Sequence, residues 1–117
     1  MSYMLLIVEP VGQRAERTED EGRALYDDMM KFSADLKSRG LLVDSQSLKD
    51  VASATRVQVR NGKPTLTDGP FAEAKEMVGG YFLLSCNTRE EALALAAECP
   101  AARWGTVEVR QFGPCYT

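Results

Sequence analysis

The sequence predicts a single α+β domain spanning residues 1–117, with strands and helices in the order βαββαβ and one inserted β-hairpin. Two kinds of observation support this prediction. Capping boxes begin at Thr18 and at Thr88, and each precedes a segment with the composition of a helix. The pair Asn61-Gly62 separates two strand-like segments, and both residues tolerate the positive φ angles of a tight hairpin turn.

The first half of the chain is predicted to fold as strand, helix, strand and strand. Residues 3–8 form an apolar run of strand length, and they are apolar on both faces. After Thr18, apolar residues recur at helical spacing until Gly40, which is typical of a helix C-terminus. Strands are expected next at residues 41–48 and 54–60.

The second half begins with the return strand of the hairpin at residues 63–67, where Pro64 favours an edge position. Residues 80–86 again form a strand that is apolar on both faces. The helix that starts at Thr88 should end before Pro100, and residues 106–112 should form the last strand. With both helices on one face of the sheet, this order predicts a ferredoxin-like fold.

Such a sheet has one face without helices, yet two of its strands are apolar on both sides. We expect a second copy of the chain to cover the open face, which gives a homodimer. The alternative is a monomer in which the inserted hairpin folds over that face.

Composition argues against several classes of function and of site. The net charge of -3, with dispersed Lys and Arg, argues against nucleic-acid binding. No apolar run approaches the roughly 20 residues of a membrane span, and the N-terminus lacks the basic start of a signal peptide, so a cytoplasmic protein is expected. The three cysteines have no C-x-x-C spacing, which argues against a disulfide framework and a zinc site. We expect no metal and no cofactor.

The most informative segment is residues 67–76, which combine turn-forming residues with four ionisable side chains. Because the chain contains no histidine, acid–base chemistry near neutral pH would require a carboxylate that is desolvated or close to another carboxylate. The candidate catalytic residues are therefore Asp68, Glu73 and Glu76. The candidate ligand-binding residues are Lys75, Tyr81 and, in the loop before the first helix, Arg14.

Each candidate also has a structural interpretation. Asp68 before Gly69-Pro70 is a common turn initiator, and Glu73, Lys75 and Glu76 could form the solvated face of a short helix that begins at Pro70. Arg14 and Arg17 could bind an anionic ligand, because the guanidinium fork matches a carboxylate, or they could be solvated loop charges. Arg103-Trp104 could lie at a cleft mouth or form a packed lid.

Several segments together carry a family resemblance: Asp68-Gly69-Pro70-Phe71, Glu73, Lys75-Glu76, Gly79-Gly80-Tyr81, and residues 3–7 and 108–110. In this register they resemble the DGPF branch of the YCII-related proteins. The resemblance implies a dimeric α+β barrel and bacterial intracellular proteins whose biochemical role is mostly unassigned. Some relatives in the wider family resemble enzymes that act on small aromatic or chlorinated compounds through a His-Asp pair. That pair cannot be carried over to a chain without histidine.

Two hypotheses follow from the sequence. The protein either performs acid–base chemistry on a small organic molecule, using Asp68 with Glu73 or Glu76, or it is a non-catalytic ligand-binding or regulatory dimer. In the second case the DGPF motif is a structural turn.

Overall fold

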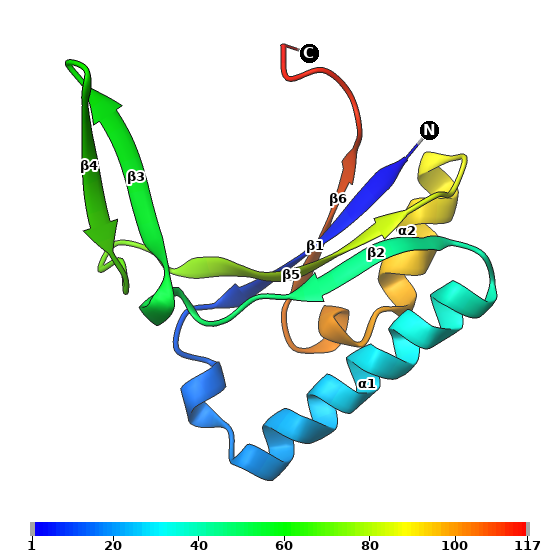
Figure 1. The fold of residues 1–117 in the computed structure, drawn as a ribbon. Helices are drawn as coiled ribbons and strands as arrows, with labels where there is room; N and C mark the ends of the chain where they lie inside the picture. Colours follow the sequence, from blue (N-terminus) through cyan, green and yellow to red (C-terminus); the bar gives the residue numbers. More distant parts are fainter. Residues whose placement is uncertain (1, 117) are drawn as a thin grey trace.

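The computed structural model describes residues 2–116 and has the predicted α+β architecture (Figure 1). Its helices are α1 (Glu19–Ser38) and α2 (Arg89–Glu98), and its strands are β1 (Tyr3–Pro10), β2 (Leu42–Ser47), β3 (Thr55–Arg60), β4 (Lys63–Asp68), β5 (Glu76–Leu84) and β6 (Thr106–Gln111). Short 3-10 turns occur at η1 (Arg14–Glu16), η2 (Val51–Ser53) and η3 (Pro100–Arg103). The main sheet has the order β2-β5-β1-β6 with antiparallel neighbours, as expected for a ferredoxin-like fold.

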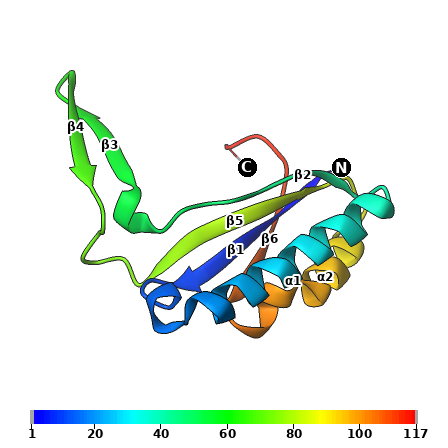
Figure 2. The same cartoon turned by 60° about the horizontal axis from the view of Figure 1, so that its bottom comes forward.

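Both helices cover the same face of the main sheet (Figure 2). Alternate residues of β1 explain this arrangement, because Tyr3, Leu5 and Ile7 are buried in the core between the sheet and the helices. Phe32 of α1 and Phe82 of β5 meet edge to face, with ring centroids 5.1 Å apart. The sheet, the two helices and η3 therefore share one core.

Thr18 and Thr88, predicted to begin the two helices, both act as N-cap residues. The Glu21 N–H donates to the Thr18 hydroxyl at 3.1 Å, and the Thr18 N–H donates to the Glu21 carboxylate at 2.9 Å, so the first capping box is complete. At α2, Thr88 accepts from the Glu91 N–H at 3.1 Å, but the Glu91 carboxylate accepts from the N–H of Asn87 at 3.4 Å. The second box is therefore only half formed.

The inserted hairpin stands away from the main sheet in both views and does not cover its open face (Figures 1 and 2). Asn61 and Gly62 have the predicted positive φ angles, 53° and 74°. Within the described residues β4 pairs with β3 alone, so Pro64 does lie on an edge strand. The projecting hairpin gives a radius of gyration of 16.0 Å, against about 13 Å for a compact chain of this length.

The open face of the sheet carries the other residues of the central strands. Met4, Leu6 and Val8 of β1 are half-buried, and Val78 of β5 is 43% exposed. On the hairpin, the apolar side chain of Leu66 is 68% exposed. Among residues 2–116, no helix is both long enough and apolar enough to cross a membrane.

Candidate functional site

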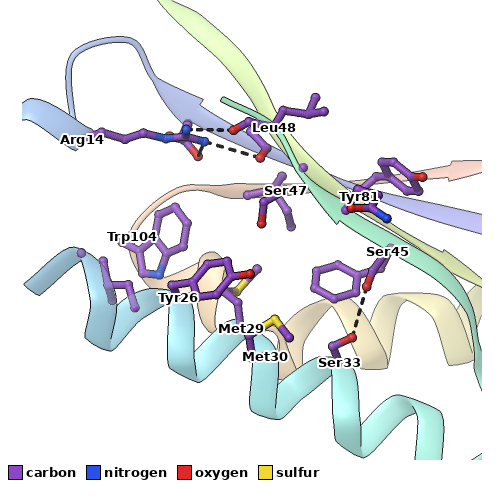
Figure 3. Close-up of a pocket in the computed structure, with 18 of the residues that line it drawn as sticks. Arg14, Tyr26, Met29, Met30, Ser33, Ser45, Ser47, Leu48, Tyr81 and Trp104 are labelled. Carbon is purple, nitrogen blue, oxygen red and sulfur yellow. Dashed lines mark hydrogen bonds and ion pairs between the residues drawn. The ribbon is translucent and has the colours of Figure 1, made fainter. Parts of the chain in front are cut away.

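A cavity of about 420 Å³ lies between α1 and the β2–β5 side of the sheet (Figure 3). Helix α1 contributes apolar side chains, among them Tyr26, Met29 and Met30. Trp104, which follows η3, supplies an indole ring. The Ser33 and Ser45 hydroxyls lie 3.1 Å apart and link α1 to β2 beside the cavity. The cavity is thus largely apolar, with a few polar groups at defined places, as is typical of small-molecule sites.

The cavity is lined by an ion pair between Glu9, which is buried, and Arg14, which is half-buried. Glu9 lies near the end of β1 in the helix-facing register of that strand, and it is only 2% exposed. The Arg14 Nε donates to Glu9 Oε1 at 2.6 Å, and Nη2 lies 3.4 Å from Oε2. A buried carboxylate requires such a partner, because desolvation penalises an isolated charge.

Arg14 also connects two strand segments of the cavity wall (Figure 3). Its Nη1 donates to the Leu48 carbonyl at 2.9 Å, just beyond β2, and Nη2 lies 3.4 Å from the Gly79 carbonyl in β5. The same guanidinium binds Glu9 at the end of β1. The side chain of Arg14 therefore connects the end of β1 with β5 and with the residue that follows β2. The predicted ligand-binding residue Arg14 does line the cavity, but protein groups occupy its donors.

The glycine pair Gly79-Gly80 makes room for this arrangement. The β1–β5 register shifts between Ile7 and Val8, where β5 has an extra residue. A Cβ atom on Gly79 would overlap Oε2 of Glu9 and would lie 2.8 Å from Nη2 of Arg14. The strand predicted at residues 80–86 therefore begins earlier, at Glu76, because the bulge lets β5 continue along β1.

Two buried polar atoms near Trp104 have no hydrogen-bond partner among residues 2–116: the indole Nε1 of Trp104 and the side-chain oxygen of Gln13. The amide nitrogen of Gln13 donates to the Trp104 carbonyl at 2.7 Å. The Arg17 guanidinium carbon lies 4.8 Å from the centre of the Trp104 ring, in the geometry of a cation–π contact. Trp104 therefore lines the cavity with a buried, unpartnered donor and a cation over its ring.

The DGPF segment forms the base of the hairpin. Asp68 ends β4, and its carboxylate accepts from the Thr55 hydroxyl at 2.9 Å. The Gly69 N–H donates to the Ala54 carbonyl at 2.7 Å, and a Cβ atom at Gly69 would collide with the Val51 carbonyl oxygen. Gly69-Pro70 is a cis peptide bond, and the Arg56 guanidinium lies 3.7 Å from the centre of the Phe71 ring.

The short helix expected from Pro70 is absent, since Phe71 to Lys75 contain one turn and no helix. The Ala74 N–H donates to the Phe71 carbonyl at 3.0 Å, and the Lys75 carbonyl then accepts from the Val11 N–H at 2.9 Å. The chain is thus drawn toward the end of β1 immediately after the turn, which leaves no length for a helix.

The structure places the predicted site residues in two different environments. Asp68, Glu73, Lys75 and Glu76 are exposed, and none of these four lines the cavity. Among residues 2–116, no group of three or more acidic or cysteine side chains could hold a metal ion. Tyr81 does border the cavity, but its hydroxyl donates to Asp44 at 2.6 Å. Figure 3 shows its ring across the strands from Met29 and Met30.

Sequence reasoning missed Glu9. The sequence pattern could have indicated it, because Glu9 falls on the same face of the strand as Tyr3, Leu5 and Ile7, which are apolar. A charged residue in the buried register of an otherwise apolar strand indicates either a buried pair or a functional site.

The comparisons with known proteins identify a family. The sequence model of the YCII-related domain matches residues 1–114. The chain belongs to the YCII-related family. An uncharacterized protein of Rhizobium meliloti (strain 1021) is 27% identical over 112 residues, which cover 94% of this chain and 90% of the relative.

Within the YCII-related family, this chain combines the expected sheet with a site that contains no histidine. The acidic group that lines the cavity is Glu9, and its partner is an arginine. The chemistry available to this member is therefore set by a carboxylate–guanidinium pair in an apolar cavity.

Proposed function

We propose that this YCII-related protein binds a small organic molecule in the cavity between α1 and the β2–β5 side of the sheet. The observation that carries the proposal is the cavity of about 420 Å³, in which apolar side chains surround a buried Glu9–Arg14 pair. Cavities of this size and polarity are typical of small-molecule sites. The indole N–H of Trp104 adds an unoccupied donor.

Binding without catalysis fits the pairing of Glu9 with Arg14 in the cavity. Both carboxylate oxygens of Glu9 lie within 3.4 Å of Arg14 nitrogens. Each oxygen of this carboxylate therefore already has a protein partner, and the pair forms part of the cavity wall. In this interpretation the DGPF motif is a structural turn, supported by the contacts of Asp68 with Thr55 and of Gly69 with Ala54.

A binding experiment tests the proposal. We expect small, largely apolar compounds to shift the indole resonance of Trp104, which is the single tryptophan, while the hairpin amides near Asn61 stay unchanged. Met30→Glu places a charge at the cavity wall and should weaken binding, because burying that charge penalises the complex. Ala34→Glu is the matched control, since it makes the same charge change on an exposed position of α1 outside the cavity. Equal affinities of the two variants for every compound would refute the proposal.

Acid–base chemistry through Asp68, Glu73 and Glu76 is the second candidate function, and it stays a prediction from the sequence. It is favoured by the density of acidic groups beside the hairpin base. Asp68→Asn distinguishes the two candidates, since it should abolish turnover if Asp68 is catalytic. If Asp68 is structural, Asp68→Ala should instead lower the free energy of unfolding by about 1 kcal/mol and leave ligand binding intact.

We further propose that the protein is a homodimer in the bacterial cytoplasm, in the dimeric barrel arrangement that the resemblance to the DGPF branch implies. Support comes from the half-buried apolar residues of the open face, the exposed hairpin residue Leu66 and the bacterial source of the Rhizobium relative. Light scattering after gel filtration tests the dimer. A species of 12.9 kDa at micromolar concentration would contradict it.

A further inference from the structure

We infer that the ligand of this cavity is an organic monocarboxylate whose head group is bound by Arg17 and the indole N–H of Trp104. The inference rests on the proposed binding function and adds the chemical class of the ligand. It begins with a charge count. The lining residues include two guanidinium groups, Arg14 and Arg17, and one carboxylate, Glu9. Because Glu9 and Arg14 neutralise each other, the cavity keeps the positive charge of Arg17.

Arg17 is available for a ligand. Among residues 2–116 it forms no salt bridge; its guanidinium carbon lies 4.8 Å from the centre of the Trp104 ring, and its charge also acts on Glu21. The neighbouring acidic residues have other partners. Glu21 accepts the N–H of Thr18 in the capping box, and Glu19 binds Arg23 at 2.7 Å.

The pKa of Glu21 supports this assignment of partners. It is lowered first by the backbone N–H and then by the hydroxyl of Thr18, and the charge of Arg17 contributes less. Thr18 is therefore the main partner of the Glu21 carboxylate, and a charge-assisted hydrogen bond from the half-buried Arg17 to a ligand anion is stronger than a neutral one.

The indole of Trp104 supplies the second donor. Its Nε1 is buried and has no acceptor among the described residues, although an unpaired buried donor is unfavourable. The same ring carries Arg17 on its face, so an anion at this end of the cavity meets both groups. A carboxylate has two oxygens and can accept from a guanidinium and an indole N–H at the same time.

The remaining wall selects an apolar body. Tyr26, Met29 and Met30 of α1 line the cavity, and polarizable methionine side chains adapt to aromatic rings. The expected ligand class is therefore a small carboxylate with an apolar or aromatic body. A cationic head is disfavoured, because it would meet the unpaired charge of Arg17.

Three probes with one apolar body test the inference: phenylacetate, phenylacetamide and phenethylamine. Affinities are measured by titration of the Trp104 indole resonance and by calorimetry. We expect phenylacetate to bind about tenfold more tightly than phenylacetamide, which corresponds to about 1.4 kcal/mol. Phenethylamine should bind most weakly.

Two variants locate the head group. Arg17→Gln should lower the affinity for phenylacetate to that of phenylacetamide and leave the amide affinity unchanged, so the amide also reports that the cavity is intact. Arg23→Gln, which removes an exposed arginine of α1 that pairs with Glu19, is the matched control and should change neither affinity. Trp104→Phe keeps an aromatic ring but removes the N–H, so it should weaken both probes, as measured by calorimetry because the variant has no tryptophan.

The outcomes separate the two levels of the proposal. Equal binding of phenylacetate and phenylacetamide would overturn the carboxylate inference and leave the binding function standing. A preference for phenylacetate that survives Arg17→Gln, or affinities unchanged by Trp104→Phe, would also overturn it. If no probe shifts the indole resonance or releases heat at millimolar concentration, the binding function fails and the inference fails with it.

Discussion

The close fit of Gly79 against the Glu9–Arg14 pair makes a strong prediction about stability. In Gly79→Ala, the new methyl group would occupy the position of the Glu9 carboxylate oxygen Oε2. Gly79 does not have a positive φ, so backbone strain is not the cause. The methyl group forces Oε2 to shift, which disturbs the pairing of the carboxylate with Arg14, and Glu9 has little solvent contact that could compensate.

The magnitude follows from two opposing effects. Breaking a buried ion pair by removing one partner typically costs about 3–5 kcal/mol. Displacement is milder than removal, and replacing glycine by alanine restricts the unfolded chain, which stabilises the native state by about 0.4–1 kcal/mol. We therefore expect Gly79→Ala to lower the free energy of unfolding by about 2–4 kcal/mol. Urea unfolding monitored through Trp104 fluorescence measures this change.

Two further variants make the test specific. Gly22→Ala in α1 has open space around the new Cβ, so it should stabilise the protein by up to about 1 kcal/mol. In a Glu9→Ala background the overlap with the carboxylate is gone, and the remaining close contact is with Nη2 at the end of the flexible Arg14 side chain, so the effect should fall below about 1 kcal/mol and the two substitutions should be strongly non-additive. Wild-type stability for Gly79→Ala, or full additivity with Glu9→Ala, would refute the reasoning.

Three other predictions concern the cap of α1, the thiols and the hydroxyl of Tyr81. Thr18→Ala removes the side-chain half of the capping box and should lower the free energy of unfolding by about 1 kcal/mol in the same urea assay. Burial raises the pKa of Cys86 and Cys99, so a thiol reagent at pH 8 should label exposed Cys115 first and all three only after unfolding, as mass spectrometry would show. The hydrogen bond to Asp44, with smaller contributions from burial, raises the pKa of Tyr81 above its ordinary value of 10.0. The stability that the Tyr81–Asp44 hydrogen bond provides is therefore present below pH 10 and is lost as the pH rises through the pKa of folded Tyr81. Tyr81→Phe should make the free energy of unfolding less dependent on pH in the alkaline range.

The helices and strands were predictable because their signals are local. The residues that cap α1 lie within four positions of one another, and the hairpin turn is set by Asn61 and Gly62 alone. The limits of β5 were less accurate, because a glycine pair resembles a break in a strand when its partners are unknown. Its true meaning, a bulge beside a buried ion pair, depends on Glu9 and Arg14, which are distant in sequence.

The candidate site was predictable only in part. A concentration of charge in a segment says little about burial, and the acidic residues of the DGPF region are exposed on the turn and on the first residue of β5. Strand phase would have been a better guide, because Glu9 shares the covered face of β1 with Tyr3, Leu5 and Ile7. The cavity itself could not be predicted, because it depends on how α1 and Trp104 pack against β2 and β5.

The two arginines of the loop before α1 illustrate why residue type alone does not assign a role. Arg14 makes its contacts with Glu9 and with the carbonyls of Leu48 and Gly79, so its charge is used to hold the cavity wall in place. Arg17, three positions later, lies on an indole face without a carboxylate partner among residues 2–116. Loss of Arg14 should therefore appear first as lost stability, since it leaves Glu9 buried and unpaired. Loss of Arg17 should appear first as lost affinity, because it removes a charge that forms no salt bridge among residues 2–116.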